Sequence, residues 1–410
     1  MSECPHRRLL DFDAFAQGIP HDRVAELRAE HAVLWEPDEH SPAGHWLVLR
    51  QAEIDHVQHT PELFTSNHGP FLEDMPASLT DPSRRSINLM DPPAHRQYRS
   101  LVEYAFRPAL LRDREPLMRD MAREIIDKVI DRGECEFVDE VAIQLPMRVM
   151  YSLLGVRPED EARVVALTNA MLFYDDPEYA AAAGLVSGFE AKQALDDFGA
   201  ALAADHRAHP RHNITMEVLE AERDGERLSN RDFGAFFTNL IAGGLDTTRN
   251  TMSWAMVEFV RHPDQYRRLQ ADPGLLPAAV EEILRFRNPV AYIRRTATQE
   301  TEIAGQRVPK GAKMLCILGA PNRDPEQFER PDEFDIGRNP MDTRRRHRTF
   351  GGGPHYCLGM HQARMNLTVM LGEIARRWDN LRLLAEPRHA RSIFMDGFNE
   401  LRLGFDRRAA

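Results

Sequence analysis

The sequence predicts a mainly α-helical protein with small β-sheets, folded as one large domain over residues 1–410. Many segments, such as residues 115–131, repeat apolar residues every three or four positions, which is the spacing of an amphipathic helix. Strand-like runs are short and occur at residues 45–49, 301–308 and 313–318. No repeat, low-complexity tract or linker divides the chain, so we expect the β-rich part at residues 30–70 to belong to the same unit.

Composition and charge narrow the class of protein. Hydrophobic residues make up 42% and charged residues 28% of the 410 residues, which is an ordinary globular mixture. The net charge of -12 argues against nucleic acid as a partner. No stretch approaches the ~20 apolar residues of a membrane span, and the N-terminus is too polar for a signal peptide. We therefore expect a cytoplasmic monomer that binds neither nucleic acid nor membrane.

The four cysteines, Cys4, Cys135, Cys316 and Cys357, are far apart and form no C-x-x-C pair. This spacing offers no iron–sulfur cluster or zinc ribbon. A cysteine with a chemical role here would therefore act alone.

Cys357 has the most informative surroundings. Residues 350–359 read FGGGPHYCLG, and three glycines with a proline favour a tight loop over a helix or central strand. Residues 358–378 then show a strong helical pattern, which places the sulfur near a helix N-terminus, where a thiol pKa is lowered. The alternative is a buried core cysteine. The loop before Cys357 and the helix after it favour a ligand or a nucleophile.

The pattern Phe350-x-x-Gly353-x-His355-x-Cys357-x-Gly359 resembles the haem-binding motif of the cytochromes P450, complete at every defining position. This resemblance implies that the Cys357 thiolate is the axial ligand of the iron in haem b. Phe350, Gly351 and Gly359 would then lie against the cofactor. It also implies the P450 fold, with haem between a long central helix and the helix that follows the cysteine loop.

A second segment, from Ser229 to about residue 261, predicts a long helix. Ser229 and Asp232 have the form of a capping box, and a His-Pro pair ends the segment at 262–263. Two adjacent glycines, 243 and 244, interrupt it at a cost of ~1 kcal/mol each relative to alanine. The alternative is a helix break, with Asp246 capping a second helix. We favour a groove opened by the glycines and widened by the Thr247 hydroxyl, which competes for backbone carbonyls.

This segment resembles the family's oxygen-binding helix, (A/G)-G-x-(D/E)-T. The resemblance implies that Gly243 borders the haem and that dioxygen is a co-substrate. Asp246 and Thr247 would form the acid–alcohol pair that delivers protons to it.

A third match is Glu282-x-x-Arg285, where the two side chains share one helix face and can pair. The motif alone is weak, but it lies between the central helix and the cysteine loop, as in the family. The resemblance adds Arg338 as the third member of a buried structural ion network.

A fourth match lies upstream, where His95 and Arg99 follow Asp-Pro-Pro and share one helix face. The resemblance implies that these two residues, with Arg295 and His355, bind the two haem propionates. The alternative is a solvated basic face.

Two features do not follow the family pattern or its function. Many relatives carry an acidic residue in A-R-x-E, whereas this chain has Ala363-Arg364-Met365-Asn366, so one expected ion-pair partner is missing. His206, His209 and His212 have a spacing that a metal could use, but Pro210 breaks the helix that would align them. We expect a surface connection there and no metal.

The sequence indicates only the chemical class of the substrate and the type of electron donor. A separate ferredoxin and its reductase would bring electrons from NAD(P)H, and the basic run 344–348 offers either their docking site or a solvated turn. By resemblance the pocket is apolar, which favours a small terpenoid, steroid or fatty-acid-like substrate. Its expected lining is Phe71, Leu72, Met75, Phe173, Tyr174, Leu240, Gly243, Val290, Ala291, Tyr292, Phe394 and Met395.

Together these features predict a haem-thiolate monooxygenase. Three other functions stay open. A peroxide-dependent enzyme of the same fold usually lacks the acid–alcohol pair, and a haem sensor or carrier does not need it. A cysteine hydrolase without haem would use Cys357 and a nearby histidine.

Overall fold

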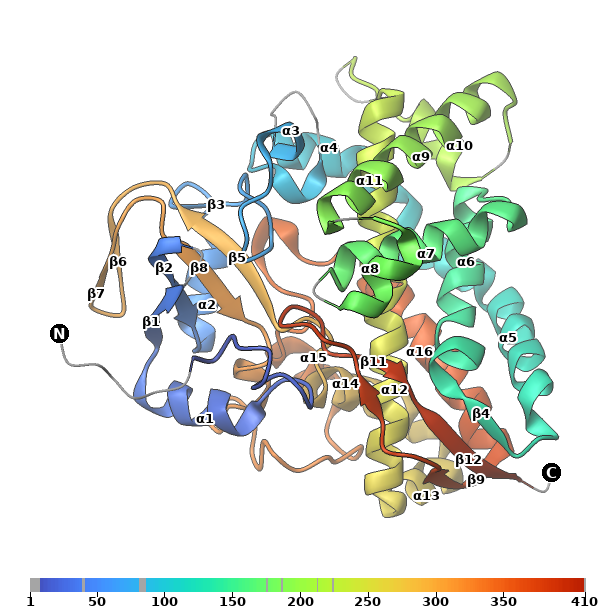
Figure 1. Cartoon of the computed structure of the whole chain (residues 1–410). Helices are drawn as coiled ribbons and strands as arrows, with labels where there is room; N and C mark the ends of the chain where they lie inside the picture. The colour runs from blue at the N-terminus through green and yellow to red at the C-terminus, as the bar shows by residue number, and fades with distance from the viewer. Residues whose placement is uncertain are drawn as a thin grey trace.

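A computed structural model describes residues 8–38, 41–80, 86–174, 176–185, 187–211, 213–222 and 225–408. It confirms a mainly helical fold with small sheets (Figure 1). The helices are α1 (His21–Glu30), α2 (Gln51–His59), α3 (Ala77–Thr80), α4 (Ala94–Val102), α5 (Pro108–Ile130), α6 (Gln144–Leu154), α7 (Glu161–Leu172), α8 (Pro177–Ala183), α9 (Gly188–Ala208), α10 (Ile214–Glu220), α11 (Asn230–Gly244), α12 (Asp246–Arg261), α13 (Pro263–Ala271), α14 (Leu276–Phe286), α15 (Pro340–Arg346) and α16 (Met360–Arg377).

The strands are β1 (Val33–Asp38), β2 (Ser41–Val48), β3 (Phe64–Thr65), β4 (Glu134–Glu136), β5 (Tyr292–Ala297), β6 (Thr301–Ile303), β7 (Gln306–Val308), β8 (Lys313–Ile317), β9 (Trp378–Leu383), β10 (Arg388–His389), β11 (Phe398–Glu400) and β12 (Arg402–Arg407). The three strand-like runs read from the sequence correspond to β2, β6 with β7, and β8.

The largest sheet joins distant parts of the chain in the order β1-β2-β8-β5-β3. Strands β2 and β8 are parallel, and the other pairs are antiparallel. The β-rich N-terminal part is thus completed by two strands from residues 292–317. This sheet lies on one side of the molecule, and most of the helices lie on the other (Figure 1). A smaller sheet, β4-β12-β9, lies beside α5 and α13 on the helical side.

The central helix begins as its sequence predicts. The Ser229 hydroxyl accepts a bond from the Asp232 N–H at 3.1 Å, and the Asp232 carboxylate accepts one from the Ser229 N–H at 3.1 Å. This reciprocal capping satisfies two donors that the first turn leaves without helical partners. The predicted capping box is therefore confirmed.

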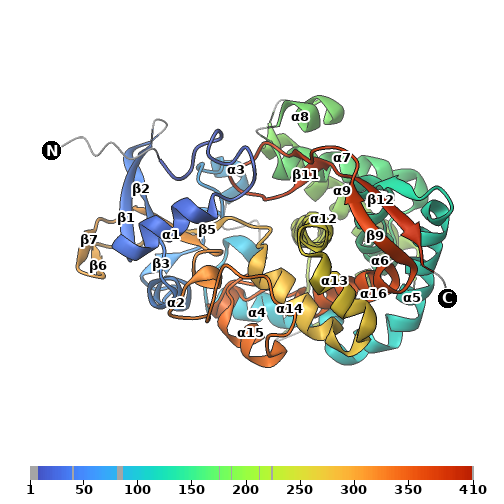
Figure 2. The same ribbon diagram turned by 90° about the horizontal axis from the view of Figure 1, so that it is seen from below.

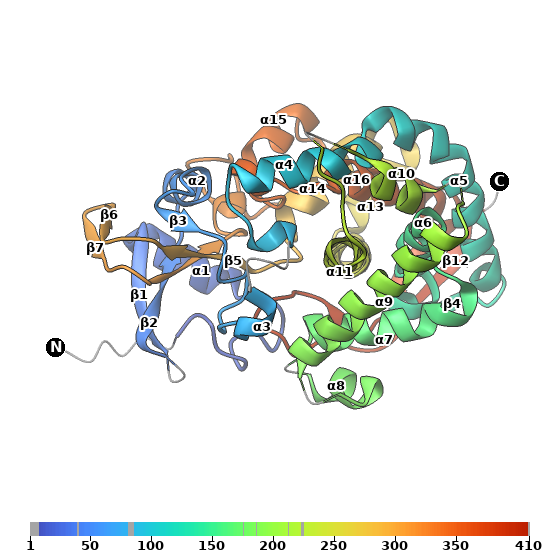
Figure 3. The same ribbon diagram turned by 90° about the horizontal axis from the view of Figure 1, so that it is seen from above.

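The predicted long helix is divided only at Leu245, into α11 and α12. Leu245 keeps helical angles, and its N–H donates to the Ile241 carbonyl, while the Arg249 N–H donates to the Leu245 carbonyl. Figure 2 shows α12 end-on from below, and Figure 3 shows α11 end-on from above, so both follow one axis. The glycines therefore cause a local distortion without a change of direction. Asp246 does not cap α12 through its side chain.

Apolar side chains pack around this central axis on both sides. One cluster surrounds α11 with α6, α7 and α9, and includes Phe233, Phe236 and Phe237. A second surrounds α12 with α5, α14 and α16, and includes Trp254 and Trp378. Within the described ranges, no helix is both long enough and apolar enough to cross a membrane.

Candidate active site

The loop before Cys357 is a tight turn held against the end of α2. Gly351 and Gly353 have φ values of +67° and +63°, a region that side chains strongly disfavour. A Cβ atom on Gly353 would lie 2.0 Å from the Gln58 carbonyl oxygen. The Cys357 N–H donates to the Phe350 carbonyl at 3.1 Å and closes the loop. The positive φ angles of Gly351 and Gly353 and the close contact of Gly353 with the Gln58 backbone explain why this loop contains glycines.

Cys357 lines a cavity of about 360 Å³ and lies just before α16. The backbone N–H of Gly359 lowers the pKa of the thiol, as expected at a helix start, but burial raises it and has the larger effect. The predicted lowering of the thiol pKa by the helix start is therefore present but is outweighed by burial. A buried thiol of raised pKa is a poor free nucleophile, whereas coordination to a metal ion would deprotonate it.

Four cationic or ionisable side chains meet in the wall of the same cavity: His95, Arg99, Arg295 and His355. The His95 and His355 rings are 4.2 Å apart, and neither ring nitrogen of buried His95 has a partner. Burial and the charge of Arg99 lower the pKa of His95 to about 4. His355 Nε2 lies 3.1 Å from Ser66 Oγ and 3.0 Å from the Met90 carbonyl oxygen.

This cluster is in contact with no carboxylate of the described cavity wall, because no aspartate or glutamate lines the cavity there. Arg295 is buried, whereas Arg99 is partly exposed and lies 3.9 Å from Glu103. A buried guanidinium beside an imidazole without partners favours an anion in the cavity. The two propionates of a haem fit this requirement, and the sulfur of Cys357 opens into the same space.

The distorted part of the central helix forms another part of the cavity wall. The Thr247 hydroxyl donates to the Gly243 carbonyl at 2.7 Å, which is the competition for backbone carbonyls that the sequence suggested. A Cβ atom on Gly243 would meet no atom within 4 Å. Gly243, Gly244 and Thr247 therefore present an open helix face to the cavity.

Asp246 lies next to Thr247 in the chain but faces away from the cavity, whose lining does not include it. Its carboxylate is 1% exposed and lies 2.6 Å from a guanidinium nitrogen of Arg249, although the angles are poor for a hydrogen bond. Arg249 also donates to Asn169 at 3.3 Å. Burial raises the pKa of Asp246, and the charge of Arg249 opposes this rise. Asp246 and Thr247 are thus neighbours in the chain, but their side chains point in different directions.

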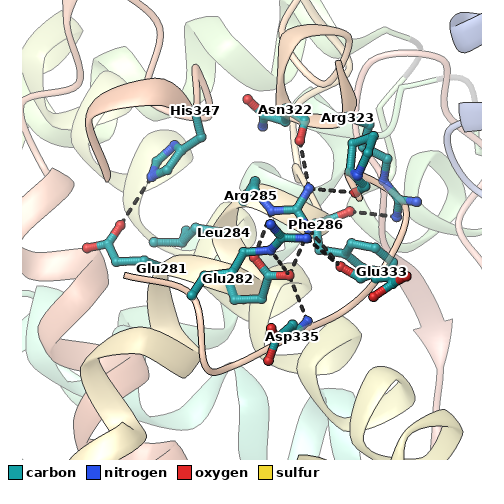
Figure 4. A network of polar contacts seen from close by, with 12 residues as sticks. Glu281, Glu282, Leu284, Arg285, Phe286, Asn322, Arg323, Glu333, Asp335 and His347 are labelled. Atoms are coloured by element: carbon teal, nitrogen blue, oxygen red, sulfur yellow. Dashed lines mark hydrogen bonds and ion pairs between the residues drawn. The ribbon is translucent and has the colours of Figure 1, made fainter. Parts of the chain in front are cut away.

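The Glu282–Arg285 pair is fully buried in α14 (Figure 4). Two guanidinium nitrogens of Arg285 lie 2.7 Å from the two carboxylate oxygens of Glu282, and Arg338 approaches the same carboxylate at 3.2 Å. Arg285 also donates to the carbonyls of Asn322, Pro331 and Glu333. The network therefore ties α14 to residues 322–338, which precede the cysteine loop.

Arg364, in the segment that lacks the usual acidic residue, pairs with a carboxylate of α14. Glu281 accepts two bonds from Arg364, at 2.6 and 3.0 Å, and lies 3.1 Å from His347. The Arg364 guanidinium also lies over the Phe350 ring at 4.5 Å. Asn366, in the position of the usual acid, instead accepts a bond from Gln362.

Most of the expected substrate-contacting residues lie in the cavity wall, and some lie behind it. Phe71, Met75, Leu240, Val290, Phe394 and Met395 line the cavity. The residues that are not part of its described lining are Leu72, Phe173, Tyr174, Ala291 and Tyr292.

The positions behind the wall have specific structural causes. Phe173 packs against Tyr179 and beneath Arg249. Tyr292 accepts a bond from the Leu72 N–H and packs against Phe394. The Ala291 backbone bonds to Phe394 and Leu318.

Several lining residues were not predicted from the sequence. They are Ile87, Asn88, Leu89, Met150, Met171, Leu172, Lys192 and Asn239, among others. The apolar members have ordinary amphipathic spacing and give no signal beyond it. Lys192 is buried, which the sequence does not indicate.

The remaining polar features lie outside the cavity. Arg348 pairs with Asp55 at 2.7 Å, whereas Arg345 is exposed at the end of α15. His206 is buried and contacts the Leu202 carbonyl and the Asn213 amide. His209 is exposed and pairs with Asp205, and His212 lies outside the described residues. No metal-binding group of histidine, cysteine and acidic residues occurs in the described part of the chain.

Comparison with known proteins shows the family of this chain. A family model described as Cytochrome P450 matches residues 189–273 and 274–383. A methyl-branched lipid omega-hydroxylase of Mycobacterium tuberculosis is 33% identical over 96% of this chain and 92% of its own length. Linalool 8-monooxygenase of Pseudomonas putida is 34% identical over 95% of this chain and 96% of its own length. A Mycobacterium marinum cytochrome P450 solved in complex with pseudoionone superposes with a TM-score of 0.87 at 32% identity, covering 99% and 100% of the two chains.

Fold and comparisons therefore define a haem-binding oxidoreductase. The chain belongs to the cytochrome P450 family and is a monooxygenase.

Proposed function

We propose that the enzyme hydroxylates or epoxidises a largely apolar small molecule such as a terpenoid, a steroid or a fatty-acid-like compound. The observation that carries this proposal is the single cavity in which Cys357, Thr247 and an apolar wall meet. Relatives named for methyl-branched lipid, steroid C26 and linalool oxidation support the substrate class.

In this proposal the Cys357 thiolate would hold the iron of haem b, and His95, Arg99, Arg295 and His355 would bind its propionates. When bound, haem supplies activation of dioxygen at its iron, and the thiolate donates electron density to it. The protein side chains orient the cofactor and close the site to water. The Glu282–Arg285–Arg338 network holds the segment that leads to the cysteine loop.

Thr247 and Asp246 handle the protons. The Thr247 hydroxyl lies in the cavity wall and would exchange its bond to the Gly243 carbonyl for one to a water molecule in the cavity, and so pass on a proton. Asp246 is buried behind Thr247, and its carboxyl group is the proton donor in this proposal. A rotation of Asp246 away from Arg249 would bring the carboxyl toward Thr247.

Electrons would come from NAD(P)H through a ferredoxin reductase and a ferredoxin. Arg344 lies close enough to His361, at the start of α16, to help burial lower the pKa of that histidine. This effect supports a location of Arg344 near the helix that follows Cys357. Arg344 and Arg345 are therefore the docking residues we propose for an acidic ferredoxin, while Arg348 is engaged by Asp55.

The test is an absorption spectrum of the purified protein, reduced and exposed to carbon monoxide. A haem-thiolate band in the wild type, lost in Cys357→Ala, would support the proposal, and a colourless wild type would refute it. Replacing Arg344 and Arg345 by glutamate should slow electron transfer and reduce its salt dependence. Turnover of substrate with peroxide alone, and none with dioxygen and electrons, would instead favour a peroxide-dependent enzyme.

A further inference from the structure

The end of α2 contacts the cysteine loop, residues 350–357, at two points. Arg348 precedes the loop, and its guanidinium donates to both carboxylate oxygens of Asp55, at 2.7 and 2.8 Å. Gly353 lies inside the loop, and its N–H donates to the Nε2 atom of His59 at 3.2 Å. Asp55 and His59 are four positions apart and therefore share one face of α2. One face of this helix thus holds both the approach to the loop and its middle.

The hydrogen bonds of His59 determine which of its ring nitrogens carries the proton. The Nδ1 atom lies 2.7 Å from the Asp55 carbonyl oxygen, and a carbonyl oxygen can only accept a hydrogen bond. Nδ1 is therefore the protonated nitrogen, and Nε2 presents its lone pair to the Gly353 N–H. The imidazole thus acts as a hydrogen-bond acceptor for the loop, and a side chain without an acceptor could not replace it.

The Gly353 N–H needs an acceptor from outside its own segment. Gly353 begins a short 3₁₀ turn, Gly353–His355, and the first N–H groups of such a turn have no partner within it. The residue before the turn is Gly352, which has no side chain that could accept this bond. His59 therefore caps the turn from a neighbouring helix, and the turn leads directly to Cys357.

Close packing of the backbone brings the loop within reach of this helix end. A Cβ atom on Gly353 would lie 2.0 Å from the Gln58 carbonyl oxygen, and one on Gly352 would lie 2.9 Å from the Gln58 side chain. The loop is also closed on itself, because the Cys357 N–H donates to the Phe350 carbonyl at 3.1 Å. The contacts of the loop with α2 therefore help to determine where the sulfur lies.

We propose that His59 is a positioning residue for the sulfur of Cys357. The imidazole holds the cysteine loop against α2 and so keeps the sulfur where it can bind the haem iron. This inference rests on the proposed function, in which Cys357 holds that iron. His59 is not part of the described cavity lining, so it acts only through the loop.

Three variants separate the hydrogen bond from the rest of the side chain. His59→Leu removes the acceptor, whereas His59→Gln supplies an amide oxygen that can accept the Gly353 N–H. His68→Leu is the control, because His68 is also exposed but lies in the segment after β3. Each holoenzyme is reduced, exposed to carbon monoxide and kept in urea below its unfolding transition. The rate at which the haem-thiolate band disappears is then measured.

His59→Leu should lose the haem-thiolate band about 3- to 10-fold faster than the wild type, because one hydrogen bond of ordinary strength is missing. His59→Gln and His68→Leu should stay within about twofold of the wild type. Hydrogen exchange gives a second measurement that does not depend on the haem. Exchange of the Gly353 amide should be faster in His59→Leu and unchanged in the other two variants.

Equal rates of band loss in the wild type and His59→Leu would overturn the inference, and so would a loss in His59→Gln as fast as in His59→Leu. A faster loss in His59→Leu without faster exchange at Gly353 would also overturn it, because the effect would not pass through this bond. A wild type without haem would refute the proposed function and this inference with it. A haem-thiolate wild type with unaffected variants would refute only the role of His59.

Discussion

The guanidinium of Arg249 lies 2.6 Å from the carboxylate of Asp246, one turn along the same helix, and both side chains are buried. The pair holds the proposed proton donor away from the cavity that Thr247 faces. In the proposed mechanism, the carboxyl would exchange its position beside Arg249 for one near Thr247 to deliver a proton. The predictions that follow begin with these two residues.

Replacing Asp246 by Asn should slow dioxygen-dependent turnover about 100-fold, because general acid catalysis by a positioned carboxyl is lost. The carbon monoxide spectrum should be unchanged, since Asp246 does not line the cavity. Turnover driven by hydrogen peroxide is the control, because peroxide brings its own protons and electrons. Full dioxygen-dependent activity in Asp246→Asn would remove Asp246 from the mechanism.

Replacing Arg249 by Met should destabilise the fold by about 3–5 kcal/mol, because it leaves a buried carboxylate without its cation. Adding Asp246→Leu should recover part of this loss, since the charge is then removed as well. Urea unfolding of both variants measures the difference. Equal stability of the single and double variants would show that the two side chains are not coupled.

Replacing Glu282 by Gln should also destabilise the fold by about 3–5 kcal/mol, because Arg285 is buried and loses its charged partner. The protein should lose haem at a lower urea concentration than the wild type, since residues 322–338 lead to the cysteine loop. Glu300→Gln is a matched control, because Glu300 forms an exposed pair with Arg307. A haem-loss midpoint unchanged in Glu282→Gln would contradict the role of the network.

Much of this site was predictable because its signals are local. The capping box at Ser229 and the glycines 351 and 353 depend on backbone geometry within a few residues, and the structure shows both. Contacts that depend on distant residues were not predictable. The direction of Asp246 is set with Arg249 and Asn169, and the partner of Arg364 is Glu281, more than 80 positions away.

The cavity wall shows the same limit. Phe173 and Tyr292 have the residue types of a pocket, but their neighbours place them behind it. Lys192 has the residue type of a surface helix, but packing of α9 on α11 buries it. The spacing of apolar residues predicts which residues share one face of a helix or strand. Which part of the protein that face packs against depends on the tertiary structure.

Replacing Gly353 by Ala should prevent stable haem binding. The substitution forces a side chain into a left-handed conformation and places its Cβ atom 2.0 Å from the Gln58 carbonyl oxygen. Gly184→Ala is the matched control, because Gly184 has φ +65° but no atom within 4 Å of the added Cβ. Haem content per protein separates the two variants. Equal haem content would show that close approach to α2 does not constrain the loop.

Asp396 should make stability depend on pH. The carboxylate is buried, and burial raises its pKa to about 6, while the charge of Arg287 and hydrogen bonds from the Ile19 backbone and Trp254 oppose the rise. A raised pKa in the folded state means that folding favours the protonated form. Its stabilising contribution is full below the unfolded pKa of ~3.9 and is lost as pH rises through about 6.

The variant Asp396→Asn cannot ionise, so its stability relative to the wild type should increase by about 2–3 kcal/mol between about pH 4 and about pH 7. Above that range the difference should stay constant. Urea unfolding across the pH series gives the measurement, and Asp264→Asn, on the exposed face of α13, should show no such trend. If the wild type and Asp396→Asn keep a constant difference through pH 6, Asp396 is already ionised in the folded protein. The groups around it, Arg287 foremost, would then outweigh its burial.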